Sequence, residues 1–232
     1  MKIDLFGIQF DNLTMDEAVE QTRGFVVLAY SEFVVRAQKD KEYKEILNKA
    51  DFCLCESRGL YLVARLIGKK LKENINGIEL IYDLSQKSKV KSQKLFLFGA
   101  TEEVVKKAAE KLGDSVVGFE HGYQDYDSVI QKINLIKPNI LLVGLGSPKQ
   151  EEFIYNNLSK MSSVKLAIGV GGAFDFISGR VRRAPRILQK IGLEWLWRLI
   201  IQPKRFKRIS KGVAGLICLT LKNMLHLKKD NN

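Results

Sequence analysis

One stretch of the sequence constrains the fold more than any other: residues 140–151, which read ILLVGLGSPKQE. Its apolar beginning predicts a buried strand, and Gly144 and Gly146 predict the tight turn that follows. Ser147 and Pro148 then suit the N-cap and the first position of a helix. A strand that turns through glycine into a helix directs backbone N–H groups and the positive end of the helix dipole at one point. This pattern predicts either a phosphate-binding turn or a strand–helix junction without a ligand.

Strands and helices alternate along the rest of the chain, which predicts an α/β fold built on a parallel sheet. Apolar runs predict strands at residues 3–10, 25–30, 51–55, 94–98, 116–120, 140–144 and 164–170. Periodicity and start signals predict helices from Thr14 onward and at 32–49, 60–67, 78–86, 102–112, 125–136 and 148–160. Thr14 and Glu17 have the spacing of a capping box, and Ser31 and Thr101 are expected as N-caps of their helices.

The length of 232 residues suits one large domain or two small ones. We interpret residues 1–203 as an α/β core, with the polar run 87–93 as the best candidate for a boundary between its halves. Residues 204–232 are interpreted as a basic, amphipathic C-terminal helical appendage.

The loops that follow the predicted strands are the expected place for a ligand. Ligands of parallel sheets bind at the carboxyl ends of the strands, so four loops should meet in one crevice. These loops lie around Gly99, Gly122, Gly146 and Gly172. The GxGxxG fingerprint of dinucleotide-binding proteins is absent, which leaves a nucleotide of another kind open.

Three polar side chains near these loops have a chemical and a structural interpretation. Glu56 directly follows a predicted strand and suits a general base, but the pattern alone favours a solvated acid that caps the next helix. Asp175 has apolar neighbours, where a buried carboxylate needs a partner, so it would hold a ligand or fix the loop at Gly171. His121 has no metal-ligand company in the sequence, so a structural role is favoured over catalysis, and no metal site is expected.

Arginines cluster around the dipeptide Ala184-Pro185. Guanidinium groups suit phosphate and pyrophosphate recognition, and a solvated basic face is the equally weighted alternative. The cluster consists of Arg180, Arg182, Arg183 and Arg186.

The charge of the chain is concentrated at its end. Residues 204–232 contain eight Lys and Arg and one acid, so they carry +7 of the net +12. Such a tail indicates a polyanionic partner, either membrane phospholipid or nucleic acid. Nucleic acid is not expected, because the sequence lacks aromatic-and-basic stacking motifs and a recognisable readout element.

The tail also has an apolar periodicity that is typical of an interfacial helix. The residues at helical spacing are Phe206, Ile209, Val213, Leu216, Ile217 and Leu221. We favour an anionic membrane as the partner, and packing on the chain's own domain or in a homo-oligomer is the alternative. The apolar run 212–221 is about half the length of a membrane-spanning helix, so none is expected.

The three cysteines form no disulfide framework, and Cys53 and Cys55 lack the spacing of zinc ligands. Buried thiols in a reducing cytosolic setting are expected. The N-terminus shows no signal-peptide pattern.

Several motifs together resemble the WecG/TagA/CpsF family of glycosyltransferases, which act in bacterial surface-polysaccharide synthesis. The resemblance covers nearly the whole chain. Its motifs are FDNLTMDE at 10–17, GLGSPKQE at 144–151, GVGGAFDF at 169–176, RAP at 183–185, and GLEW at 192–195 with Arg198 and Pro203.

The resemblance implies a Rossmann-like core and the transfer of a sugar, typically of N-acetylmannosamine type, from a UDP donor. The acceptor would be a sugar linked to polyprenyl diphosphate at the inner, cytoplasmic face of the bacterial membrane. It also implies an inverting reaction without metal or other cofactor, with the basic tail bringing the enzyme to the membrane as a peripheral protein. Glu56 would be the catalytic base. The expected substrate-binding residues are Tyr30, Gly99, Ala100, Thr101, Gly122, Tyr123, Gly144, Gly146, Ser147, Pro148, Lys149, Gln150, Gly171, Gly172, Asp175, Arg182, Arg183, Arg198, Arg205 and Arg208.

The first half departs from the family pattern. Leu28 and Tyr30 stand where members usually have Thr and Asn, Glu56 stands for Asp, and Asn74 stands for Arg. Gln150 is retained. These departures indicate a different sugar, a different acceptor or weak activity, so a family member that binds UDP-sugars with lapsed or altered catalysis is the alternative.

Overall fold

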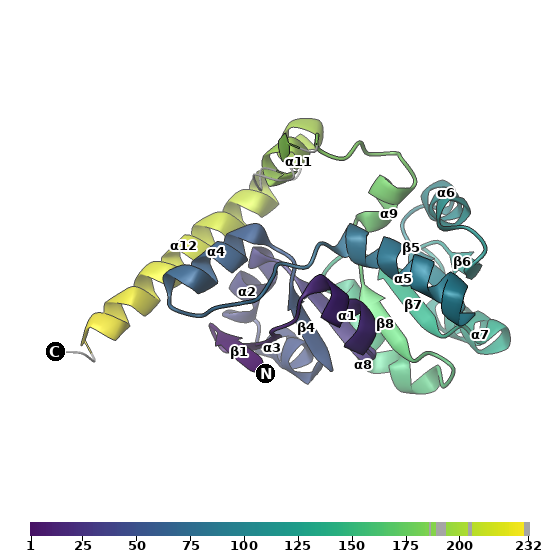
Figure 1. The fold of residues 1–232 in the computed structure, drawn as a ribbon, viewed down its shortest axis with the longest axis horizontal. Helices are drawn as coiled ribbons and strands as arrows, with labels where there is room; N and C mark the ends of the chain where they lie inside the picture. The colour runs from purple at the N-terminus through teal and green to yellow at the C-terminus, as the bar shows by residue number, and fades with distance from the viewer. Residues whose placement is uncertain (186, 189–193, 204–205, 230–232) are drawn as a thin grey trace.

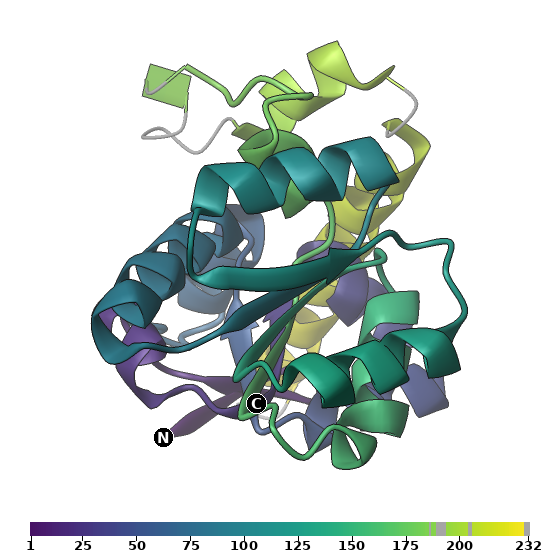
Figure 2. The same cartoon turned by 90° about the vertical axis from the view of Figure 1, so that its right-hand side faces the viewer.

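The computed structural model describes residues 1–185, 187–188, 194–203 and 206–229. Within them, one parallel sheet has the strand order β4-β3-β8-β7-β5-β6, and helices cover both of its faces (Figures 1 and 2). Its strands are β3 Gly24–Ala29, β4 Phe52–Cys55, β5 Leu95–Gly99, β6 Val116–Glu120, β7 Ile140–Gly144 and β8 Leu166–Gly169. The expected Rossmann-like α/β architecture is therefore confirmed.

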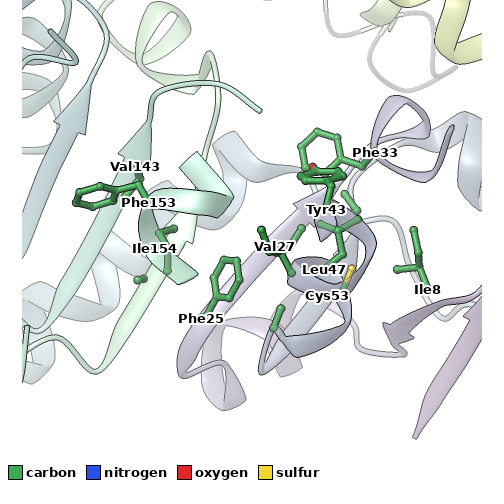
Figure 3. Packing of buried hydrophobic residues seen from close by; sticks show 14 of the residues in the cluster. Ile8, Phe25, Val27, Phe33, Tyr43, Leu47, Cys53, Val143, Phe153 and Ile154 are labelled. Atoms are coloured by element: carbon green, nitrogen blue, oxygen red, sulfur yellow. The ribbon is translucent and has the colours of Figure 1, made fainter. Parts of the chain in front are cut away.

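The two faces of the sheet bury different sets of strand residues, because side chains alternate along each strand. In β3, Phe25 and Val27 face one hydrophobic cluster and Val26 and Leu28 face the other. Figure 3 shows the first cluster, where Phe25 and Val27 lie between Ile154 of one covering helix and Tyr43 and Leu47 of another. The helices are α1 Met15–Gln21, α2 Ser31–Ala37, α3 Lys41–Lys49, α4 Arg58–Leu66, α5 Gly77–Lys91, α6 Glu102–Leu112, α7 Tyr126–Ile136, α8 Lys149–Asn157, α9 Ala173–Ile177, α11 Glu194–Ile201 and α12 Phe206–Lys229, with a short 3-10 helix at Leu158–Lys160.

The prediction of one strand over residues 3–10 was wrong. These residues form an antiparallel hairpin of β1 Lys2–Leu5 and β2 Ile8–Asp11. The chain reverses at Phe6 and Gly7, with φ angles of 57° and 80°. A two-residue turn with both φ angles positive matches the twist of a hairpin, but phenylalanine is a rare residue for it, so the sequence carried little warning.

Two predicted helix boundaries were also wrong. Residues 32–49 form α2 and α3 rather than one helix, because Asp40 accepts a hydrogen bond from the Tyr43 backbone N–H and starts a new helix. Ser31 is the first residue of α2, whose N-cap position is Tyr30. The capping box of Thr14 and Glu17 is confirmed by both of its hydrogen bonds.

The polar run 87–93 is not a linker over most of its length, because α5 continues to Lys91 and ends at Ser92 in the left-handed conformation. Within this run, Lys87 binds the neighbouring helix α1, since its Nζ donates to the Val19 carbonyl at 2.6 Å and lies 2.8 Å from Glu20 Oε1. Strands from both halves share the one sheet. A division of the core into halves stays a prediction.

The long C-terminal helix α12 packs along α2, as Figure 1 shows. Two glycines allow a close approach: a Cβ at Gly212 would lie 2.6 Å from Glu32 Cγ, and one at Gly215 would lie 2.5 Å from Val35 Cγ1. Leu216 is buried on this side of α12. Among the described helices, none combines the length and the apolarity needed to cross a bilayer.

Candidate active site

The helices that begin at the centre of the sheet differ from the other helices in how their N-termini are capped. Strands β3, β8, β7 and β5 are adjacent, and they lead into α2, α9, α8 and α6. None of these four helices has a side-chain hydrogen bond at its N-cap position; the N-cap residues are Tyr30, Gly172, Pro148 and Thr101.

The remaining helices from α1 to α7 are all capped by a side chain, at Thr14, Asp40, Ser57, Asn76 and Asp125. Helix N-termini carry partial positive charge, and a side-chain cap satisfies part of it. At the central edge of the sheet, the N-termini of α2, α6, α8 and α9 therefore lack a side chain that accepts a hydrogen bond from their first N–H groups. This arrangement suits an anionic ligand.

The turns at this edge are packed against one another as expected. The Ala100 N–H donates to the Gly144 carbonyl at 3.2 Å, and the Gly122 N–H donates to the Ala100 carbonyl at 2.9 Å. Gly99 has a φ of 135°, and a Cβ there would lie 2.5 Å from the Gly144 carbonyl oxygen, so only glycine fits. Ala100 has a φ of 57°, a costly conformation for a residue with a Cβ that is found mostly at functional sites.

Gln150 joins the turns after β7 and β8. Its Oε1 accepts hydrogen bonds from the Gly146 N–H at 3.2 Å and from the Gly171 N–H at 2.8 Å. Its Nε2 donates to Glu151 Oε1 at 2.6 Å, and the side chain is 2% exposed. The expected convergence of the four glycine loops is thus observed, with Gln150 behind them as the connecting group. Contact of Gln150 with a ligand stays a prediction.

Ser147 and Pro148 do not act as the sequence indicated. Helix α8 begins at Lys149, Pro148 occupies the N-cap position after a cis peptide bond, and Ser147 does not cap the helix. The Ser147 hydroxyl instead lies 2.8 Å from the hydroxyl of Tyr43 in α3. The reason is a tertiary partner that is 104 positions away in the sequence. Lys149 is exposed at the start of α8.

Glu56 lies at the carboxyl end of β4, next to the start of α5. Its Oε1 accepts a hydrogen bond from the Gly77 N–H at 3.0 Å, and its own N–H donates to the Ala29 carbonyl at 3.1 Å. It does not cap the following helix α4, because the Ser57 hydroxyl accepts the hydrogen bond from the Leu60 N–H. The carboxylate is therefore held at the positive end of α5.

Leu28 and Tyr30 lie at the carboxyl end of β3, the strand that pairs with β4. Leu28 is 1% exposed, and its Cδ1 would lie 2.9 Å from a Cβ at Gly77, which would also lie 2.7 Å from Glu56 Oε1. Tyr30 is partly buried, with its ring centroid 5.8 Å from that of Phe33. This part of the site is lined by side chains rather than by glycine turns.

Asp175 lies in α9, and the arginines follow this helix in the sequence. The Asp175 side chain is 24% exposed and forms a 3.9 Å ion pair with Arg180, so it is less buried than its apolar neighbours indicated. Arg183 Nη2 lies 3.3 Å from Glu79 Oε1 at the start of α5. A pocket of about 310 Å³ is lined by Arg180, Val181, Arg182, Trp197, Ile201 and Gln202.

The remaining predicted residues are placed as follows. Thr101 is at the start of α6, and Tyr123 is 82% exposed, with its N–H donating to His121 Nδ1 at 3.3 Å. Arg198 and Arg208 are positions of α11 and α12, whereas Arg186 and Arg205 lie outside the described residues.

Among the residues that the structure describes, no group of three His, Cys, Asp or Glu is arranged to hold a metal ion. Cys53 and Cys55 are buried, free thiols, and Cys218 is exposed.

The sequence reasoning missed Tyr43 and Glu151. Both are almost fully buried, at 2% and 0% exposure. Tyr43 contacts Ser147 in the turn before α8, and Glu151 accepts a hydrogen bond from Gln150. Helical spacing with Ile154 places Glu151 on the buried face of α8, and this was the signal available in the sequence.

Comparison with known proteins agrees with this geometry. The model of the glycosyl transferase WecG/TagA/CpsF family matches residues 3–230. The chain belongs to this family. Its relatives include proteins of Staphylococcus aureus strains NCTC 8325 and MRSA252, each 34% identical over 225 residues, which span 90% of this chain and 88% of the relative. A relative from strain MW2 is 33% identical over the same shares.

All three relatives are named N-acetylglucosaminyldiphosphoundecaprenol N-acetyl-beta-D-mannosaminyltransferase. The WecG/TagA/CpsF match covers the glycine turns, the Arg182–Arg183 segment and α12 alike. The chain is therefore a glycosyltransferase, and the edge with uncapped helix ends is its candidate active site.

Proposed function

We propose that this enzyme transfers a sugar, of N-acetylmannosamine type or another hexose, from a UDP-sugar to an acceptor linked to polyprenyl diphosphate. The observation that carries the proposal is the set of helix ends without side-chain caps at β3, β8, β7 and β5. Helix N-termini and glycine turns favour a diphosphate. The names of the Staphylococcus aureus relatives supply the acceptor class and the sugar.

The proposed reaction is a direct displacement with inversion at the anomeric carbon. Glu56 takes the proton of the acceptor hydroxyl while the acceptor oxygen forms a bond to that carbon. The bond from the anomeric carbon to the β-phosphate oxygen breaks, and the electron pair leaves with UDP. The position of Glu56 at the end of a strand, held by the Gly77 N–H, supports this role.

The leaving UDP gains negative charge, which the protein has to stabilise. The groups available for this are the helix ends and the arginines. Arg182 lines the pocket beyond α9, and Arg183 follows it in the sequence. Further along the chain are the tail arginines Arg198, Arg205 and Arg208. In this proposal no metal ion takes part, and the groups that neutralise the diphosphates belong to the protein.

A transfer assay tests the proposal. Full-length protein is incubated with UDP-N-acetylmannosamine and a short-chain prenyl-diphosphate-linked N-acetylglucosamine, and the glycosylated lipid is measured. Formation of the disaccharide lipid is expected, and other UDP-hexoses are then compared. If no donor is turned over with any such acceptor, the proposed activity is wrong.

The alternative function is a family member that binds UDP-sugars without transferring them. The observation that favours it is the apolar Leu28, which is buried beside Glu56 where members usually have threonine. A thermal-shift panel of UDP, UDP-hexoses and UDP-N-acetylhexosamines addresses it, because a ligand of the native state raises apparent stability. Clear stabilisation without any turnover would favour this alternative.

We also propose that the enzyme is a peripheral protein at the inner face of the cell membrane, bound through residues 204–232. One side of α12 packs on α2, and the other side exposes Val213, Ile217 and Leu221, which are 45%, 54% and 56% exposed. Basic residues precede these positions in α12, at Lys207, Arg208 and Lys211, and each contributes roughly 1 kcal/mol of attraction near an anionic surface. A homo-oligomer that covers the same apolar side is the competing arrangement.

Flotation with vesicles separates the two arrangements. Binding to vesicles that contain an anionic phospholipid, with loss of binding in the I217S/L221S variant and in high salt, is expected for a membrane surface. The oligomer would be favoured if vesicle binding depended neither on the I217S/L221S substitutions nor on salt. In that case sedimentation velocity should also show a dimer that the same variant dissociates.

A further inference from the structure

A carboxyl group that the proposed reaction does not use lies behind the turns at Gly146 and Gly171. Glu151 is in the first turn of α8 and is 0% exposed. Removing a carboxylate from water is costly unless it is hydrogen-bonded, so the partners of Glu151 define what it does.

Every partner of this carboxyl belongs to one buried network. Glu151 Oε1 accepts the hydrogen bond from Gln150 Nε2 at 2.6 Å, and Oε2 accepts one from the Tyr43 hydroxyl at 3.3 Å. The Tyr43 hydroxyl also lies 2.8 Å from the Ser147 hydroxyl. Tyr43 reaches the network from α3, next to Phe33, on the face of the sheet that Phe153 of α8 also covers (Figure 3).

The network determines which way the Gln150 amide points. A carboxylate only accepts hydrogen bonds, so the NH₂ group of Gln150 has to face Glu151. The carbonyl oxygen then faces the N–H groups of Gly146 and Gly171, which are 3.2 and 2.8 Å away. With the amide reversed, its NH₂ group would oppose these two donors and the turns would lose their connection.

The neighbouring strand leaves room for this pair of side chains. A Cβ at Gly169 of β8 would lie 2.7 Å from Gln150 Nε2 and 3.1 Å from Glu151 Oε1. The pair therefore fits directly against β8, where a side chain at position 169 would collide with it.

We propose that Glu151 is a positioning residue of this glycosyltransferase. Through Gln150, it holds the turns after β7 and β8 in the arrangement that receives the diphosphate of the donor. This inference rests on the proposed function, because it takes the crevice to be the UDP site.

The ionisation of Glu151 makes the inference measurable. Burial raises the pKa of Glu151 to about 7, although hydrogen bonds from Gln150, Ser147 and Tyr43 act in the opposite direction. Cys53 of β4 and Tyr43 face it, both with pKa values raised by burial, and Arg36 lies 5.6 Å from the Tyr43 ring centroid. A protonated Glu151 donates a hydrogen bond, competes for the Gln150 carbonyl and so weakens the connection between the turns.

The experiment is a titration of the full-length protein with UDP by calorimetry between pH 5.5 and 8.5. The variants are E151Q and Y43F, with E152Q as the matched control because Glu152 is an exposed carboxylate one residue further along α8. UDP has a phosphate that titrates near pH 6, but this contribution is common to all proteins, so it cancels when two proteins are compared at the same pH. The pH profile of E151Q, which lacks the Glu151 carboxyl group, supplies this contribution for wild type and E152Q.

We expect wild type and E152Q to lose affinity together, by roughly 10-fold beyond the UDP contribution between pH 8 and 6. E151Q should bind about 5- to 10-fold more weakly than E152Q at pH 8 and lack this extra pH dependence. In Y43F, the loss should begin at higher pH, since the Tyr43 hydrogen bond lowers the pKa of Glu151.

Two outcomes would overturn the inference. One is an E151Q profile that coincides with that of E152Q, and the other is a profile that is weaker but parallel at every pH, which would indicate a packing defect. If E151Q does not fold, the Y43F shift decides, and its absence overturns the inference. If wild type itself does not bind UDP at any pH, the proposed function fails and this inference fails with it.

Discussion

The two sides of the candidate site are built differently. The turns after β5, β7 and β8 form a backbone wall, in which glycine N–H groups, helix ends and the buried Gln150 define the surface. The turns after β3 and β4 form a side-chain wall, in which Leu28, Tyr30 and Glu56 define it. A backbone surface recognises a group common to all donors, such as a diphosphate, and a side-chain surface changes with each substitution. Substitutions at Leu28, Tyr30 or Glu56 can therefore change the side-chain wall and leave the backbone wall as it is.

The largest expected effect belongs to the side-chain wall. The E56Q variant should lose at least about 100-fold in the rate of sugar transfer, because removal of a general base typically costs 10²–10⁴-fold. UDP affinity should stay within about two-fold, since the backbone wall is unchanged. The measurement is turnover with a lipid-diphosphate acceptor beside calorimetry with UDP. Undiminished turnover would remove Glu56 from the base role.

Behind the backbone wall, Glu151 should make the stability of the fold depend on pH. Its pKa is raised by burial from 4.5 to about 7, so the folded state holds the proton more tightly than the unfolded state. The contribution of Glu151 to stability is therefore largest below pH 4.5 and declines as the pH rises to about 7, by on the order of 3 kcal/mol. Urea unfolding of wild type and E151Q at pH 5 and 8 measures it. An equal pH dependence in both proteins contradicts this prediction.

The close contact between two turns of the backbone wall should tolerate no side chain. G99A places a Cβ 2.5 Å from the Gly144 carbonyl oxygen at a φ of 135° and should destabilise the fold by about 3 kcal/mol. G68A is the control, because Gly68 has a φ of 77° but nothing within 4 Å, so only the strain of about 1–2 kcal/mol applies. Thermal unfolding ranks the two variants, and equal losses would mean that the turns do not touch in solution.

The smallest effect compares one helix end from each wall. N76A removes the side chain that accepts hydrogen bonds from the Ile78 and Glu79 N–H groups and should cost about 1 kcal/mol. T101A removes no such bond at the start of α6 and should change unfolding by less than about 0.5 kcal/mol. Chemical denaturation measures both. A larger loss for T101A than for N76A would reverse the comparison.

Much of the backbone wall could be predicted from the sequence, because its signals are local. Strand 140–144, the glycine turns and the capping box at Thr14 each depend on a few consecutive residues, and the structure confirms them. The predictions failed where a side chain binds a partner that is distant in the sequence. Ser147 binds Tyr43 instead of capping α8, and the run 87–93 continues helix α5 to Lys91, with Lys87 bound to the Val19 carbonyl of α1.

The side-chain wall and the buried network were harder to predict for the same reason. Glu56 finds its partner at Gly77, and Tyr43 meets Glu151 across 108 positions of sequence. Such pairs become visible only when the sheet brings α3, α5 and α8 together. The family resemblance identified the members of the side-chain wall but not their contacts.

The packing of α12 on α2 also has a mechanical consequence. At Gly212 and Gly215, α12 packs directly against Glu32 and Val35 of α2 without space for a side chain. We therefore expect the two helices to move together. Helix α2 starts directly after Tyr30, so the contact at Glu32 lies in its first turn, two residues from Tyr30. We expect a displacement of α12 to be passed through α2 to the side-chain wall at Tyr30, while the backbone wall stays anchored to the centre of the sheet.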